Sequence, residues 1–150
     1  MVVSPDVGST ARARAFSMKL GTNMAIVDKR RERANQSEVM NLIGDVSGKT
    51  CILLDDIVDT AGSLCGAARA LVEIGGAKEV YACVTHGVLS GPAIERISES
   101  PIKELLLLDT IPYPSDKPAC DKIHYLTTAG VFAEAIRRIY EEVSISNLFE

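Results

Sequence analysis

Three acidic residues and a turn of small residues follow one of the most apolar stretches of the chain. Ile52-Leu53-Leu54 leads into Asp55 and Asp56, and Asp59 precedes Thr60-Ala61-Gly62-Ser63. Carboxylates accept hydrogen bonds from vicinal hydroxyl groups, and such charge-assisted bonds are roughly twice as strong as neutral ones. Successive backbone N–H groups of a small-residue turn that opens a helix can point at one anion. Hydroxyl groups at one end and an anion at the other indicate a pentose 5-phosphate.

The acidic pair also has a purely structural explanation. Asp often caps the N-terminus of a helix, and Asp55 and Asp56 could do no more than that. Their place in the chain favours the sugar-phosphate site. A continuously apolar strand belongs in a sheet covered on both faces, and such sheets bind ligands at the carboxyl ends of their strands.

A second segment concentrates positive charge. Lys29-Arg30-Arg31-Glu32-Arg33 places four cations in five positions directly after a predicted strand, without an apolar residue to anchor them. We expect a mobile, solvated loop, which could be no more than a charged surface segment. Because it follows a strand on the edge that also carries the anion turn, it is a candidate lid that brings positive charge to a phosphoryl group.

Alternating strands and helices with short connections predict an α/β fold with a mostly parallel, twisted sheet and helices on both faces. The predicted strands are Met1–Ser4, Met24–Asp28, Cys51–Asp55, Glu79–Thr85, Glu104–Thr110 and Lys122–Thr127. The predicted helices are Ser9–Leu20, Gly62–Ile74, Gly91–Glu99 and Gly130–Glu142. In the last helix, helical spacing puts one apolar face against the sheet, formed by Phe132, Ala135, Ile136, Ile139 and Tyr140. Val39–Val46 is a candidate hairpin arm, and Pro112–Cys120 reads as a surface loop.

Composition limits the classes of function. The net charge of −4 argues against a general nucleic-acid surface, which needs a basic excess. No apolar run approaches the roughly 20 residues that cross a bilayer, and no leader segment is evident, so a cytoplasmic protein is expected. The four cysteines lack CxxC spacing and are interpreted as reduced packing residues.

The segment from Asp55 to Ser63 closely resembles the ribose-phosphate signature of the type I phosphoribosyltransferase superfamily. Within it, the chain most resembles the ribose-phosphate pyrophosphokinases, or PRPP synthetases. Three further stretches carry that likeness, namely Val3–Gly8, Asp28–Arg31 and Ser144–Phe149. The likeness runs through residues 1–150, which form one phosphoribosyltransferase-like domain in this interpretation. It covers only the C-terminal half of the family's chain, and the N-terminal half is absent.

The resemblance implies an enzyme that transfers the diphosphoryl group of ATP to the C1 hydroxyl of ribose 5-phosphate, giving PRPP and AMP for nucleotide biosynthesis. It implies catalytic roles for Lys29 and Arg31. It implies substrate binding by Asp55, Asp56, Asp59, Thr60, Ala61, Gly62 and Ser63. Asp6 matches the family's magnesium-binding Asp, although an Asp after Pro5 also forms turns.

Ser144, Ser146 and Phe149 match a regulatory phosphate or ADP site between subunits, for which a frayed tail is the alternative. The resemblance also implies a homo-oligomer, since full-length relatives form dimers assembled into hexamers. Ser9 stands where many members have a second Gly, and Ser63 replaces the more usual Thr.

Because the family's adenine pocket belongs to N-terminal domains, we expect this chain alone to bind ribose 5-phosphate and to make little or no PRPP. Two other functions stay open. A phosphoribosyltransferase would use the same turn, but no segment provides the hood that recognises its base. A non-catalytic regulatory subunit associated with the synthetase is the other alternative.

Overall fold

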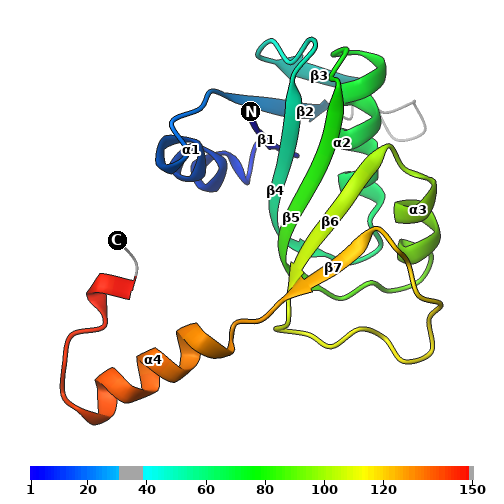
Figure 1. Ribbon diagram of the computed structural model, residues 1–150. Coiled ribbons are helices and arrows are strands. Elements are labelled where there is room, and N and C mark those ends of the chain that lie inside the picture. Colours follow the sequence, from blue (N-terminus) through cyan, green and yellow to red (C-terminus); the bar gives the residue numbers. More distant parts are fainter. Residues whose placement is uncertain (31–38, 149–150) are drawn as a thin grey trace.

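The computed structural model describes residues 1–30 and 39–148, and within them seven strands form one sheet in the order β3-β2-β1-β4-β5-β6-β7 (Figure 1). The strands are β1 (Val2–Ser4), β2 (Met24–Arg30), β3 (Val39–Ile43), β4 (Thr50–Val58), β5 (Glu79–Gly87), β6 (Ile102–Leu108) and β7 (Ile123–Leu126). Every neighbouring pair is parallel except β2 with β3, which is antiparallel. The predicted mostly parallel α/β sheet is confirmed.

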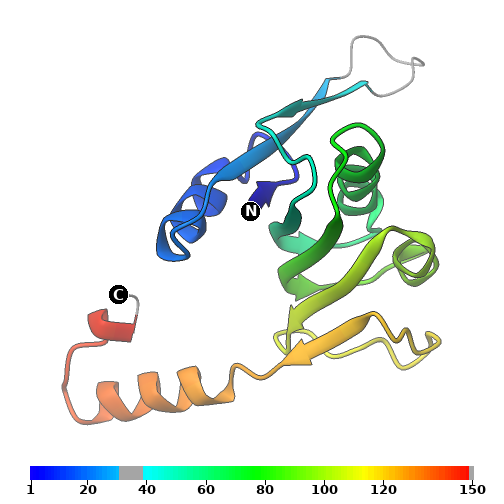
Figure 2. The ribbon, with the colours of Figure 1, turned by 45° about the horizontal axis from the view of Figure 1, so that its top comes forward.

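Four α-helices and one 3₁₀ turn complete the described part of the chain. They are α1 (Thr10–Lys19), α2 (Gly62–Glu73), α3 (Ala93–Glu99), α4 (Ala129–Tyr140) and η1 (Ser146–Leu148). Helices α2 and α3 pack together over one face of the sheet, and α1 contacts β1, β2 and β4 from the other (Figures 1 and 2). None of these helices is long and apolar enough to cross a membrane.

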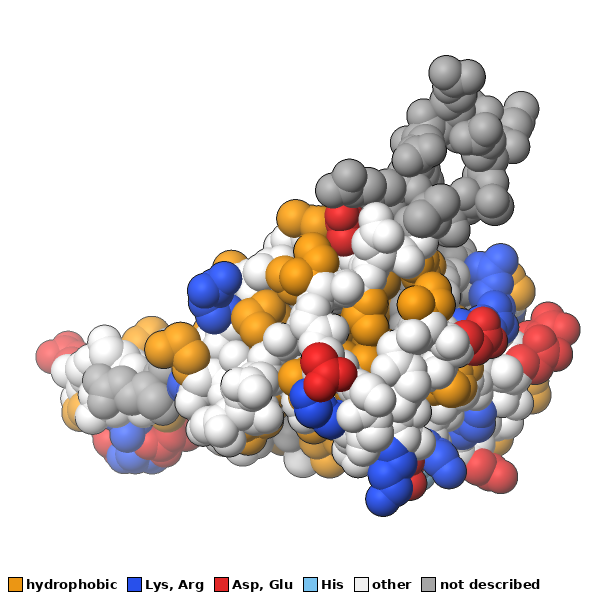
Figure 3. Space-filling view, turned by 90° about the horizontal axis from the view of Figure 1, so that it is seen from above, with side chains coloured by type: hydrophobic (Ala, Val, Ile, Leu, Met, Phe, Trp, Pro, Cys, Tyr) orange, Lys and Arg blue, Asp and Glu red, His pale blue; other side chains and the backbone are white. Residues whose placement is uncertain are grey.

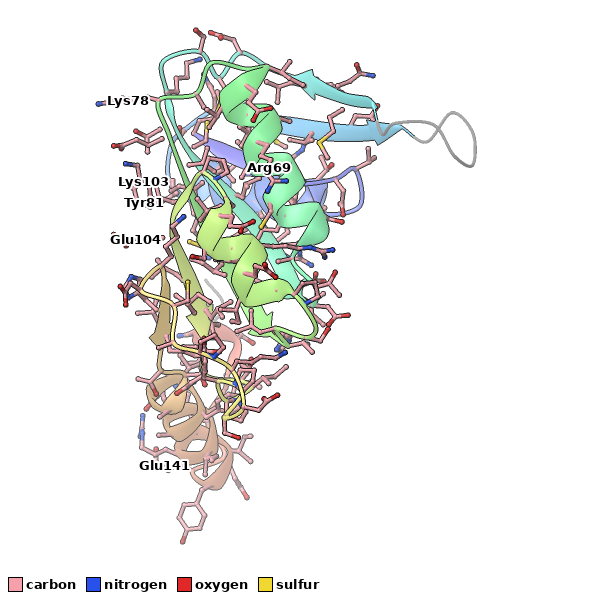
Figure 4. All side chains as sticks on the ribbon, turned by 90° about the vertical axis from the view of Figure 1, so that its right-hand side faces the viewer. Arg69, Lys78, Tyr81, Lys103, Glu104 and Glu141 are labelled. Carbon is pink, nitrogen blue, oxygen red and sulfur yellow. The ribbon has the colours of Figure 1, made fainter. Side chains whose placement is uncertain are left out.

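The core lies between the sheet and the α2–α3 layer. Val80, Ala82 and Val84 alternate along β5 and are almost fully buried, as are the small residues Ala67 and Ala68 of α2. The intervening residues of β5 are only half-buried, because they lie on the face that α1 covers in part. Figure 4 shows Tyr81, Lys103 and Glu104 on the side of the sheet away from α2 and α3. Seen from above, hydrophobic side chains also gather on the surface (Figure 3).

The chain reverses its direction of travel across the sheet between β1 and β4. From β1 it moves outward to β2 and β3, then crosses back to β4 and continues to β7. Parallel strands that diverge in this way leave a crevice at their carboxyl ends, which is the usual ligand site of open α/β sheets. Asp6 follows the carboxyl end of β1, and Asp55 lies near the carboxyl end of β4. The sheet therefore brings two predicted site residues to one edge.

The predicted packing of the last helix against the sheet is wrong. Helix α4 has no buried residue, and Phe132, Ile136, Ile139 and Tyr140 are between 61% and 88% exposed. Figures 1 and 2 show α4 extending away from the sheet. Asp109 accepts hydrogen bonds from the backbone N–H and hydroxyl of Thr128, at 2.7 and 2.6 Å, just before the helix begins. The amphipathic pattern is real, but its apolar face has no partner among the described residues.

Three smaller differences concern the ends of elements. Strand β4 continues to Val58 where the prediction ended at Asp55, so Asp56 also lies within it. Strand β2 continues to Arg30, so the predicted loop does not begin at Lys29. The expected hairpin arm at 39–46 is present as β3, which pairs antiparallel with β2 but ends at Ile43. Of the four cysteines, Cys51 and Cys65 are buried and Cys83 and Cys120 are partly buried, and none is paired in a disulfide.

Candidate functional site

A cavity of about 430 Å³ opens at the carboxyl ends of β1 and β4. One side is formed by the turn after β1 and the start of α1, and the other by the end of β4 and the turn into α2. Its lining comprises Asp6, Gly8, Ser9, Arg12 and the continuous segment 55–64. The structure therefore brings Asp6, Asp55, Asp56, Asp59, Thr60, Ala61, Gly62 and Ser63 to one cavity.

The turn into α2 is shaped to leave amide groups open. Ala61 is the N-terminal cap residue of α2 and has left-handed backbone angles, with φ of 59°. No side chain caps this helix end. The first N–H that bonds back to the cap is that of Cys65, which donates to the Ala61 carbonyl at 3.0 Å. The amides of Gly62, Ser63 and Leu64 are thus available to an anion, at the positive end of the helix dipole.

The segment after β5 braces this turn from behind. The N–H of Ser90 donates to the Asp59 carbonyl at 3.1 Å, and the Ser90 hydroxyl donates to the Asp59 carboxylate. Arg96 of α3 donates from Nη1 to the carbonyl of Thr60 at 2.9 Å. One oxygen of Asp59 is therefore already used by the protein. Sequence reasoning missed Ser90 and Arg96, and only their position after the strand next to β4 could have indicated them.

Asp55 and Asp56 lie side by side near the end of β4 and share protein partners. Oδ1 of Asp55 accepts hydrogen bonds from the Ser9 hydroxyl at 3.1 Å and from the Asp56 N–H at 2.9 Å. Arg12 of α1 donates from Nη2 to Asp56 Oδ2 at 2.8 Å, and its Nη1 lies 3.6 Å from Asp55 Oδ1. Arg12 was not among the predicted site residues, because it lies on a different element from the acidic motif.

The two carboxyl groups have different proton affinities. Burial raises the pKa of Asp55, the hydrogen bonds from Asp56 and Ser9 partly offset this, and the adjacent Asp56 carboxylate raises it further. For Asp56 desolvation is the largest single cause and raises the pKa, but the charge of Arg12 and the hydrogen bonds with Asp55 and Arg12 together outweigh it, so the pKa of Asp56 lies below its ordinary value. The exposed Asp56 is therefore the more acidic member of the pair.

Asp6 lies in the turn that follows β1. Its Oδ1 accepts the Ser9 N–H at 2.7 Å, and the Ser4 hydroxyl donates to its carbonyl at 2.7 Å. These bonds are the turn geometry that an Asp after a Pro commonly stabilises. The carboxylate nevertheless lines the cavity. No group of three or more His, Cys, Asp or Glu side chains among the described residues comes together as a complete metal site.

The remaining predicted residues are placed in part. Lys29 is a backbone partner of Met40 near the end of β2, on the same edge of the sheet as the end of β1. Arg31, at the centre of the predicted lid, and Phe149 lie outside the described residues. Ser144 and Ser146 follow α4 and bond to each other through their hydroxyl oxygens at 3.2 Å. Neither serine lines the cavity.

Comparisons with known proteins agree on one family. The chain is 60% identical over all 150 residues to the ribose-phosphate pyrophosphokinase of Clostridium tetani, and 59% identical to that of Clostridium acetobutylicum, covering 46% of each. The chain therefore spans about half the length of these relatives. Its structure is similar to that of phosphoribosylpyrophosphate synthetase from Mycobacterium smegmatis, with a TM-score of 0.83 and 38% identity over 94% of this chain and 45% of that one.

More distant structures share the fold alone. An adenine phosphoribosyltransferase from Thermoanaerobacter pseudethanolicus superimposes with a TM-score of 0.53 at 18% identity, covering 71% of this chain and 67% of that one. The α/β fold is therefore that of the type I phosphoribosyltransferases. The model of the phosphoribosyl synthetase-associated domain matches residues 31–150. Because this match covers most of the chain, the protein belongs to the phosphoribosyl synthetase-associated domain family.

Proposed function

We propose that this chain carries the ribose 5-phosphate half of a ribose-phosphate pyrophosphokinase site. The observation that supports this most is the cavity at the ends of β1 and β4, which is lined by both the acidic pair and an uncapped helix end. Asp55 and Asp56 accept hydrogen bonds from the ribose hydroxyls. The amides of Gly62, Ser63 and Leu64, with the hydroxyl groups of Thr60 and Ser63, hold the 5-phosphate.

The reaction is the transfer of the β,γ-diphosphoryl group of ATP. The C1 oxygen of ribose 5-phosphate forms a bond to the β-phosphorus, and the bond from that phosphorus to the oxygen shared with the α-phosphate breaks. AMP leaves with that oxygen, and the proton of the C1 hydroxyl passes to solvent. Such transfers require alignment and cations around spreading negative charge. Lys29, at the edge where β1 ends, and Arg31 supply positive charge in this proposal.

Magnesium is the expected cofactor. Mg²⁺ in phosphoryl-transfer sites is commonly held by one or two carboxylates together with water and substrate phosphates. The donor set at the mouth of the cavity suits that pattern, because Asp6 uses one carboxylate oxygen for the turn and lines the cavity with its side chain. When bound there, the ion would neutralise charge on the transferring phosphates.

Two experiments test the proposal. Isothermal titration calorimetry with ribose 5-phosphate and Mg²⁺ should show saturable one-to-one binding to the native chain and a loss of about tenfold or more in the Asp55→Asn/Asp56→Asn variant. A coupled assay of AMP release should show little or no turnover by this chain alone. Equal binding by both proteins would contradict the sugar site. Robust turnover would contradict the half-site interpretation.

A non-catalytic role beside an active synthetase is the second candidate, favoured by the match of residues 31–150 to the model of the phosphoribosyl synthetase-associated domain. Adding the chain to a full-length relative separates the two possibilities. A regulatory subunit changes the relative's rate of AMP release and retains that effect after substitution of Lys29 and Arg31. We also place the protein in the cytoplasm, where ATP and pentose phosphates are metabolised.

Self-association is part of the proposal. The exposed apolar face of α4, formed by Phe132, Ile136, Ile139 and Tyr140, has no partner among the described residues. A second hollow of about 290 Å³ lies on the partly covered sheet face and is lined by apolar residues that include Phe16, Leu106 and Leu108. In a dimer, each copy of the chain presents both the apolar face of α4 and this apolar hollow to the other copy. Light scattering at micromolar concentration should show at least a dimer, and particles of 16.1 kDa alone would contradict it.

A further inference from the structure

Arg12 lies in the cavity but belongs to none of the predicted motifs. Its Nη2 donates to Asp56 Oδ2 at 2.8 Å, and its Nη1 lies 3.6 Å from Asp55 Oδ1. The side chain of Asp55 is 16% exposed, that of Arg12 41% and that of Asp56 55%. One guanidinium group therefore spans both carboxylates, with its inner contact in a largely dry environment and its outer contact near solvent.

Ser9, Arg12 and the Asp56 N–H donate to one oxygen of each carboxylate. Oδ1 of Asp55 accepts the Ser9 hydroxyl at 3.1 Å and the Asp56 N–H at 2.9 Å, in addition to facing Arg12. Oδ2 of Asp56 accepts the hydrogen bond from Arg12. The hydrogen bonds from Ser9, Arg12 and the Asp56 N–H thus fall on Oδ1 of Asp55 and Oδ2 of Asp56. These three donors do not use the second oxygen of either carboxylate, which can accept a hydrogen bond from a ligand.

Adjacent carboxylates repel each other, and without a cation such a pair shares a proton or turns apart. A guanidinium group is planar and carries several N–H donors in a fixed fork, so it can hold two acceptors in one arrangement. We propose that Arg12 is a positioning residue that fixes Asp55 and Asp56 so that their two open oxygens receive the vicinal hydroxyls of the sugar. This inference rests on the proposed function, since the hydroxyls are those of ribose 5-phosphate.

Arg12 acts on the hydroxyl end of the ligand and not on its phosphate end. Its recorded contacts are to Asp55 and Asp56, whereas the amides that hold the phosphate belong to the turn into α2. Loss of Arg12 should therefore weaken the binding of ribose 5-phosphate and leave the binding of inorganic phosphate unchanged. Lysine at this position supplies a point charge without the fork, so it should restore binding only in part.

Calorimetric titration of the native chain and of Arg12→Gln, Arg12→Lys and Arg14→Gln tests this. Arg14 is exposed on the same helix and does not line the cavity, so its variant is the matched control. We expect Arg12→Gln to weaken the binding of ribose 5-phosphate about fivefold to tenfold. Arg12→Lys should recover part of that affinity, and Arg14→Gln should bind as tightly as the native chain. Unchanged or tighter binding by Arg12→Gln, or an equal loss with inorganic phosphate, would overturn the proposal.

A second measurement separates this inference from the proposed function. The side-chain carboxyl carbons of Asp55 and Asp56 can be followed by ¹³C NMR without any ligand. Arg12→Gln should shift both signals, and Arg14→Gln should shift neither. If the native chain does not bind ribose 5-phosphate but both signals move, the proposed substrate is wrong and the holding role of Arg12 stands. Signals that do not move in Arg12→Gln refute the holding role whatever the ligand.

Discussion

Replacing Arg96 with methionine removes a brace from the anion turn without touching the ligand. Arg96 donates from Nη1 to the carbonyl of Thr60 at 2.9 Å, and a Cβ added to Gly62 would lie 3.5 Å from the same nitrogen. The bond fixes the peptide that precedes Ala61, whose left-handed φ of 59° aims the following amides. Methionine keeps the length and apolar stem of the side chain and removes both the donor and the charge.

The size of the effect follows from exposure. A hydrogen bond from a charged donor contributes about 1.5–3 kcal/mol when buried. Arg96 is exposed, so the lower range for solvated charges applies, and a loss of about 1 kcal/mol is expected. That free energy corresponds to roughly fivefold weaker binding of ribose 5-phosphate.

Isothermal titration calorimetry with ribose 5-phosphate and with inorganic phosphate measures this loss at both ends of the ligand. Since the turn holds the phosphate, Arg96→Met should weaken the binding of both ligands by a similar factor. Arg69→Met is the control, because Arg69 is an exposed residue of the neighbouring helix α2 and does not line the cavity (Figure 4). Native affinity for both ligands in Arg96→Met would refute the bracing role. A loss confined to ribose 5-phosphate would also refute it, because the hydroxyl end lies elsewhere.

Three further predictions concern pH, packing and assembly. Because burial raises the pKa of Asp55 and the ionised carboxylate is the form that accepts hydroxyls, affinity for ribose 5-phosphate should be full above that raised pKa and fall as acidification protonates Asp55. Calorimetry from pH 7 to 4, with inorganic phosphate as reference, checks this, and a flat ratio between the two ligands contradicts it. Gly75→Ala places a Cβ 2.4 Å from Val46 Cγ2 and 2.8 Å from the Leu71 carbonyl, so it should destabilise the fold by about 1–3 kcal/mol. A Cβ added at Gly130 would meet no atom within 4 Å, so Gly130→Ala should not destabilise the fold. Equal denaturation midpoints for the two variants would contradict this description of the packing. Ile136→Ser, at a side chain 66% exposed on α4, should reduce the mass seen by light scattering while leaving the melting temperature unchanged, and an unchanged mass would exclude this face from the interface.

The part of the site that lies on one segment could be predicted from the sequence. Residues 55–63 contain the acidic pair, the small-residue turn and the helix start in a row, so their order along the chain already fixes their order in space. The apolar run before them indicated β4, and the alternation of elements indicated the parallel sheet. The predicted end of this strand at Asp55 came before the observed end at Val58, because a polar residue near the end of a strand has the same local pattern as one just after it.

The contacts that cross between elements could not be predicted. Arg12 of α1 and Ser9, which lies just before that helix, contact Asp55 from 43 and 46 positions away in the chain, and their residue types do not indicate these contacts. Ser90 and Arg96 brace the turn from the segment after β5 for the same reason. The error at α4 has a related origin. Spacing of Phe132, Ile136 and Ile139 identifies an apolar face, but periodicity alone does not identify the surface that covers it.

A crystal structure of the chain with ribose 5-phosphate tests the central claim most directly. We expect the sugar in the cavity between α1 and the start of α2, with its vicinal hydroxyls on Asp55 and Asp56 and its phosphate on the amides of Gly62, Ser63 and Leu64. A sugar phosphate bound elsewhere, or bound in the cavity with its phosphate against Arg12, would contradict it.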